Sequence, residues 1–135
     1  MAERTDPDLE ALVTDFYAAF DNRGGSAPAV DALRAMFGEA ATITRVTSDQ
    51  VDTWDADAFI APRQAMLTDG TLQDFHEWET DARTVVLDNI ASRWSTYEKL
   101  GTLNGADYRG GGHKFIQLHR QDGRWRIASI LWEDI

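Results

Sequence analysis

The chain has 135 residues, a length that suits one domain, and its 13 basic and 23 acidic side chains give a net charge of −10. Such an acidic chain lacks the positive surface that binds nucleic acid or an anionic membrane, so we expect neither partner. It has no cysteine, which excludes disulfides, thiolate nucleophiles and cysteine-bound zinc. No apolar run is long enough to span a membrane, and the polar N-terminus does not read as a signal peptide. We therefore expect one domain over residues 1–135, located in the cytoplasm.

Apolar side chains recur at helical spacing three times in the first half of the chain. The first stripe runs from Leu9 to Phe20 and follows a potential helix cap at Thr5 or Asp6. The second covers about residues 28–37, and the third covers about residues 56–68. Proline inside a helix removes a hydrogen bond and clashes with the preceding turn. The third helix should therefore either kink at Pro62 or start near it.

From about residue 71 the apolar pattern has the period of strands. Strands are expected over residues 40–47, 72–80, 83–87, 90–100, 112–120 and 124–133, with a polar loop over 48–55 and a bulge or bend at the glycines 110–112. Helices followed by hairpin-linked strands predict an α+β fold, in which three helical segments pack on a strongly curved antiparallel sheet. A sheet that curls over a helix forms a cone, and its open mouth is a natural ligand site.

The last hairpin predicts a partner. A two-residue turn at Asp122-Gly123 would set Ile130 opposite Phe115 and Trp132 opposite His113. Both faces of this hairpin then carry large apolar side chains, so something should cover the face away from the helices. A second copy of the chain is the simplest cover. We predict a homodimer whose interface includes Phe115, Ile130 and Trp132.

Four segments carry a resemblance to a known superfamily. They are LEALVTDFYAAF at 9–20, FIAPRQAMLTDGTLQDFHEW at 59–78, NIASRWSTYE at 89–98 and GHKFIQLHRQDGRWRIASILWED at 112–134. In this order they resemble the nuclear transport factor 2-like superfamily, in its SnoaL-like branch, over nearly the whole chain. The resemblance implies a cone-shaped, cystatin-like α+β roll that is usually dimeric through its sheet, with a pocket between helices and sheet. It implies no single function, because the superfamily includes isomerases, cyclases, hydrolases, dehydratases and transport factors.

Two of the expected strands carry residues suited to acid–base chemistry beside a carbonyl. Alternation over residues 72–80 puts Asp74, His76 and Trp78 on one face, where Asp74 or His76 could act as the base. Tyr97 could donate a hydrogen bond to the oxygen that becomes negative. The structural alternatives are a solvent-facing Asp74, a half-buried His76 with satisfied nitrogens, and a Tyr97 that anchors the sheet or a dimer interface.

The remaining candidates concern the pocket. Trp78 and Trp94 could line it, and an acidic ligand would need Arg45 or Arg63 as its partner. The three histidines lack zinc-site spacing and the glycine run lacks the features of a phosphate loop, so we expect no metal and no cofactor.

Two hypotheses follow. The protein could bind a small, mainly apolar molecule in its cone and catalyse proton abstraction or hydration beside a carbonyl, as an isomerase, cyclase or hydratase. Alternatively, it could be a non-catalytic dimer with a structural or regulatory role.

Overall fold

A computed structural model of the chain describes residues 6–135. Its α-helices are α1 (Pro7–Ala18), α2 (Leu33–Met36) and α3 (Ala56–Thr68), and 3-10 helices lie at η1 (Arg23–Gly25) and η2 (Val30–Ala32). The strands are β1 (Phe37–Val46), β2 (Val51–Trp54), β3 (Leu72–Leu87), β4 (Ile90–Leu103), β5 (Ala106–Gln121) and β6 (Arg124–Asp134).

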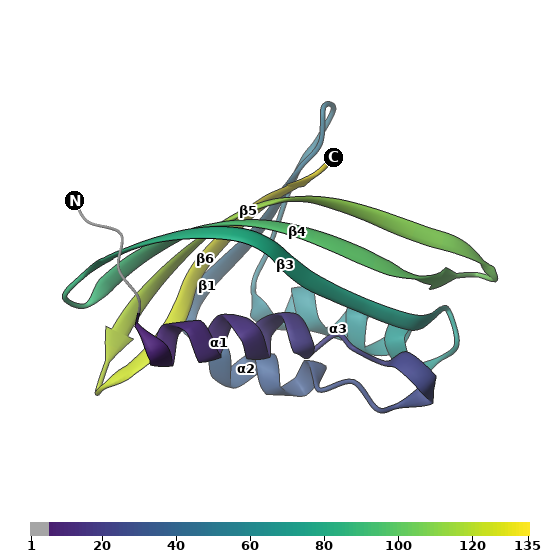
Figure 1. Ribbon diagram of the computed structural model, residues 1–135, viewed down its shortest axis with the longest axis horizontal. Coiled ribbons are helices and arrows are strands. Elements are labelled where there is room, and N and C mark those ends of the chain that lie inside the picture. Colours follow the sequence, from purple (N-terminus) through teal and green to yellow (C-terminus); the bar gives the residue numbers. More distant parts are fainter. Residues whose placement is uncertain (1–5) are drawn as a thin grey trace.

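The strands form one sheet in the order β2-β1-β6-β5-β4-β3. Neighbouring strands are antiparallel except β1 and β6, which are parallel. No tight turn links β1 to β6, because most of the chain lies between them, so nothing forces that pair to be antiparallel. The sheet arches over the helices, which lie together on its concave side (Figure 1). The predicted α+β class and the curved, mostly antiparallel sheet are confirmed.

Helix α1 forms where the apolar stripe and the cap predict it. The Asp6 side chain accepts hydrogen bonds from the backbone N–H groups of Asp8 and Leu9, both at 3.1 Å, while Thr5 lies outside the described residues. The stripe turns its side chains toward the sheet, where Leu9 and Phe16 are almost fully buried. This burial fixes one face of the helix against the sheet.

Several boundaries differ from the sequence prediction. Helix α3 begins at Ala56 and continues through Pro62, so it does not start at the proline. Residues 51–54, expected as loop, form the edge strand β2, whose backbone pairs with β1. The two strands expected over residues 72–87 are one strand with two register shifts. No helix in the described part of the chain is long and apolar enough to cross a membrane.

The last hairpin has the predicted turn but a shifted register. Asp122 and Gly123 have φ angles of 52° and 74°, as a tight hairpin turn requires. Further along, Leu118 pairs with Ile127 but Gln117 pairs with Ser129, so Ala128 is an extra, bulged residue. Every pair farther from the turn is therefore shifted by one residue from the register predicted from the sequence.

The bulge changes which residues of β6 face the helices. Beyond it, Phe115 pairs with Leu131, and Ile116 pairs with Ile130. Ile130 and Trp132 consequently point inward, with only 2% and 9% of their surfaces exposed. This corrects the predicted interface: Phe115 lies on the outer face, whereas Ile130 and Trp132 are inside the cone and Leu131 takes the outer position.

Candidate functional site

A cavity of about 260 Å³ lies between the helices and the inner face of the sheet. The helices and the turn after α1 contribute apolar walls that include Phe16, Phe20, Phe59 and Met66. The sheet contributes charged and hydroxyl groups to the opposite wall: Arg45, Glu77, Tyr97, Lys99, Lys114 and Asp134. The cavity therefore has an apolar side and a polar side, which is the usual make-up of a small-molecule site.

Strand alternation explains why charged side chains enter this cavity. On β5, Lys114 shares the inward face with the buried Ile116 and Leu118. On β3, Glu77 shares the inward face with the buried Phe75, which also lines the cavity. Both charges thus stand where the strand pattern would otherwise place apolar side chains.

Lys114 and Glu77 form a buried ion pair. The Lys114 Nζ lies 3.2 Å from Glu77 Oε2, and the two side chains are 7% and 12% exposed. The same Nζ lies 3.4 Å from the centre of the Tyr97 ring, a cation–π contact. Burial lowers the pKa of Lys114, and the negative charge of Glu77 opposes that shift. The pair thus places a proton acceptor beside a cationic donor.

Asp134 is the centre of a second polar group in the cavity. It accepts a short hydrogen bond from the Tyr97 hydroxyl, and Lys99 Nζ and Arg45 Nη2 each lie 3.2 Å from one of its oxygens. Burial and the neighbouring carboxylate raise the pKa of Tyr97, so its hydroxyl stays protonated. Tyr97 is therefore in the cavity, as predicted, but its proton is already directed to Asp134.

Glycine at position 112 makes this contact possible. A Cβ there would lie 2.2 Å from the Glu133 carbonyl oxygen and 2.7 Å from the Tyr97 hydroxyl. Only glycine leaves room for the two strands and the phenol to approach so closely. The register between β4 and β5 passes through residues 110–112 without a shift, so of the bulge or bend expected at the glycine run, no bulge forms between these strands.

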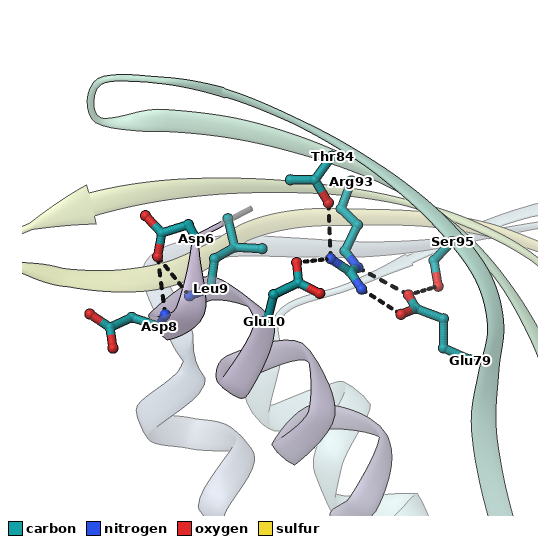
Figure 2. Close-up of polar contacts among 8 residues, drawn as sticks. All are labelled: Asp6, Asp8, Leu9, Glu10, Glu79, Thr84, Arg93 and Ser95. Carbon is teal, nitrogen blue, oxygen red and sulfur yellow. Dashed lines mark hydrogen bonds and ion pairs between the residues drawn. The ribbon is translucent and has the colours of Figure 1, made fainter. Parts of the chain in front are cut away.

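A separate polar network joins α1 to the sheet (Figure 2). The Arg93 guanidinium reaches Glu79 on β3, Glu10 on α1 and the Thr84 hydroxyl. Glu79 also accepts a hydrogen bond from Ser95. These side chains are not among those that line the cavity, and their contacts link α1 to strands β3 and β4.

The other predicted catalytic residues lie elsewhere. Asp74 is exposed, with a φ of 49°, and accepts a hydrogen bond from the Gly24 N–H at 2.9 Å. His76 stacks on Trp78 with ring centres 4.5 Å apart, and neither lines the cavity. The cause is a register shift between Gln73 and His76, which reverses the alternation that Leu72 sets. Asp74 and His76 are thereby removed as bases acting in the cavity.

The predicted pocket residues divide in the same way. Arg45 lines the cavity, as predicted. Trp78 lies outside it, and Trp94 is 48% exposed on the outer face, against Phe115. Sequence reasoning missed Glu77, Lys114 and Asp134. A lysine alternating with Ile116 and Leu118 is the one signal that could have identified such a group.

Within residues 6–135, no group of three or more histidine, aspartate or glutamate side chains could hold a metal ion.

No protein-family model matches the sequence, and no curated protein matches it either. Solved structures do resemble it. An NTF-2-like protein of unknown function from Silicibacter pomeroyi is 22% identical, the likeness covering 95% of this chain and 93% of that one at a TM-score of 0.63. A protein of unknown function with a cystatin-like fold from Nostoc punctiforme is 15% identical. The likeness covers 95% of this chain and 89% of that one, with a TM-score of 0.69. A candidate scytalone dehydratase from Novosphingobium aromaticivorans is 14% identical. The likeness covers 95% of this chain and 82% of that one, with a TM-score of 0.74.

The chain therefore has the fold of the nuclear transport factor 2-like proteins, a cystatin-like α+β roll. The resemblance drawn from the sequence is confirmed at the level of the fold. Because one fold can carry unrelated reactions, the fold alone does not define the chemistry of the cavity.

Proposed function

We propose that this protein binds a small, mainly apolar molecule carrying a carbonyl oxygen inside its cone, and that it catalyses proton transfer beside that carbonyl. The open cavity supports binding, because a cone filled by its own aromatic side chains would leave no room for a ligand. The observation that carries the chemistry is the buried pair of Glu77 and Lys114 on the polar wall. A relative in fold that is named as a candidate dehydratase is consistent with acid–base chemistry.

In the proposed reaction, Glu77 is the base and Lys114 the oxygen-binding group. The Glu77 carboxylate takes a proton from the carbon next to the carbonyl, and the electron pair left behind moves onto the carbonyl oxygen. The Lys114 ammonium donates a hydrogen bond to that oxygen as it becomes negative. Such a donor is worth more in a buried site than in water, because little solvent screens it. Tyr97 acts on Lys114 through its ring rather than on the ligand through its hydroxyl.

Two measurements test this function. A thermal-shift screen of aromatic and terpenoid ketones should identify compounds that stabilise the wild type. In D₂O, NMR should then show the protein exchanging the protons next to the ketone carbonyl. Glu77→Gln should keep binding and lose at least about a hundredfold in exchange rate, as removal of a general base does. His76→Ala is the matched control, because His76 is titratable but lies outside the cavity. Exchange that survives in Glu77→Gln contradicts the mechanism, and a screen without hits contradicts the binding.

We also propose that two copies of the chain associate through the outer face of the sheet. The alternative hypothesis of a non-catalytic dimer requires the same kind of association. Trp94, Phe115 and Leu131 are register partners on adjacent strands, so their side chains form one row across that face. They are 48%, 51% and 45% exposed. A contiguous row of large apolar side chains is typical of a protein interface.

A further inference from the structure

The cavity holds more positive than negative charge. Its lining has four cationic and two anionic side chains: Arg45, Arg63, Lys99 and Lys114 against Glu77 and Asp134. Glu77 pairs with Lys114, and Asp134 is shared by Arg45 and Lys99. Within residues 6–135, Arg63 forms no ion pair. A chain with a net charge of −10 therefore encloses a cavity with two positive charges in excess.

Aromatic rings surround Arg63, the cavity cation without an ion-pair partner among the described residues. Its guanidinium carbon lies 3.9 Å from the centre of the Phe59 ring, 5.7 Å from that of Trp132 and 5.8 Å from that of Trp54. Partial burial lowers the pKa of Arg63 to about 10. The group is still charged at neutral pH. Arg63 is partly buried, and a partly buried charge without a counter-ion is costly, so this site favours an incoming anion.

The hydrogen-bonding capacity of Arg63 is also largely unused. Its Nη1 donates to the Phe59 carbonyl oxygen at 3.0 Å, and in the described part of the chain this is its one acceptor. A guanidinium has five N–H donors arranged as a planar fork that matches a carboxylate. Since Arg63 lines the cavity, its remaining donors can meet a ligand there.

We propose that the preferred ligand is a small apolar carbonyl compound that also carries one carboxylate, held by Arg63 through that carboxylate and by the helix phenylalanines through its apolar body. This inference rests on the proposed function, because it names the ligand class of the same cavity. A carboxylate fits better than a phosphate, since one guanidinium fork framed by three rings offers a flat, singly charged site. A cavity of ~150 Å³ can hold benzene, so about 260 Å³ suits a two-ring acid.

The test compares 2-naphthoate with its uncharged amide, 2-naphthamide, by isothermal titration calorimetry at neutral pH and about 0.15 M salt. The two probes share a shape and differ in charge. The wild type should bind naphthoate at least about tenfold more tightly, the usual effect of a charge-assisted bidentate pair. Arg63→Met and Arg63→Gln should each bring that ratio close to one while still binding naphthamide. Arg124→Met removes an exposed arginine at the far hairpin and should leave the ratio unchanged.

The other possible outcomes separate the anion site at Arg63 from the proposed binding of a ligand in the cavity. If naphthamide binds the wild type as tightly as naphthoate, the cavity binds ligands but the anion site is overturned. The same holds if both Arg63 variants keep the preference while melting as cooperatively as the wild type. If neither probe binds the wild type, the anion site and the proposed binding function both fail.

Discussion

Asp134 shows how a single carboxylate can organise one wall of the cavity. Burial alone would raise its pKa, but the hydrogen bond from Tyr97 and the charges of Lys99 and Arg45 outweigh that effect and hold the pKa below its usual 3.8. The ionised form is therefore more stable in the folded protein than in the unfolded chain. Folding stability must then depend on pH through this group.

The pH dependence has a definite direction. A lowered pKa stabilises the fold above the unfolded value of 3.8, and this stabilisation is lost as pH falls through the folded pKa. We expect Asp134→Asn to lower the free energy of unfolding by about 2 kcal/mol at pH 7, and the gap to the wild type to close below about pH 4. Urea unfolding at several pH values measures this. The exposed Asp49→Asn is the control, and a gap for Asp134→Asn that stays constant with pH would disprove the linkage.

At the level of elements, the network around Arg93 adds polar contacts between α1 and the sheet to the apolar ones. The Arg93 side chain is 6% exposed, the Glu79 side chain 18% and the Glu10 side chain 40%. Glu79 is thus a mostly buried carboxylate whose counter-charge comes from a neighbouring strand. Removing one partner of such a pair leaves the other charge buried and uncompensated, which costs more than losing an exposed pair.

We therefore expect two substitutions in this network to differ. Arg93→Met should lower the free energy of unfolding by about 3 kcal/mol, because Glu79 then lacks its cation. Glu10→Gln should cost less than about 1 kcal/mol, because Glu10 is the most exposed partner. Chemical denaturation of both variants at neutral pH provides the comparison. Equal costs would mean that the network is no more than a surface ion pair.

Sequence patterns predicted most elements because their signals are local. The period and caps of α1 and the Asp122-Gly123 turn depend on neighbouring residues alone. Bulges do not depend on neighbouring residues alone. The extra residues on β3 and at Ala128 arise from how a strand pairs with its partner strands. One bulged residue moves each side chain after it on the strand to the opposite face of the sheet, until another bulge intervenes. The bulge on β3 brought Glu77 into the cavity in place of His76.

The site was predictable where no bulge intervened. Strand β4 has no shift against β5, and Tyr97 lies in the cavity as alternation indicates. Arg45, predicted as the partner of an acidic ligand, lines the cavity because it alternates with the buried Ile43 on β1. Asp134 could not be found, because its inward direction depends on the Ala128 bulge and its partners come from two other strands.

For the whole molecule, charge and apolar surface are separated. The exterior carries the excess of acidic groups, while the cavity carries an excess of basic ones. The outer face of the sheet has a third character, since the apolar row of Trp94, Phe115 and Leu131 carries no charge of its own. Its same-face neighbours along the strands are Ser92, Thr96, His113, Gln117, Ser129 and Glu133. A surface with an uncharged centre is where two acidic chains can meet with least repulsion.

Association through this row predicts a particular effect of a charge at its middle. In a two-fold contact the same residue of both copies lies near the axis, so Phe115→Glu would bring two carboxylates together while removing two apolar rings from the interface. We expect sedimentation at micromolar concentration to show a dimer for the wild type and a monomer for Phe115→Glu, with both variants equally folded by circular dichroism. Val51→Glu is the control, because Val51 is 66% exposed on β2 and lies outside the row, so this variant should remain dimeric. A monomeric wild type would refute the association, and a dimeric Phe115→Glu would place the interface on another face.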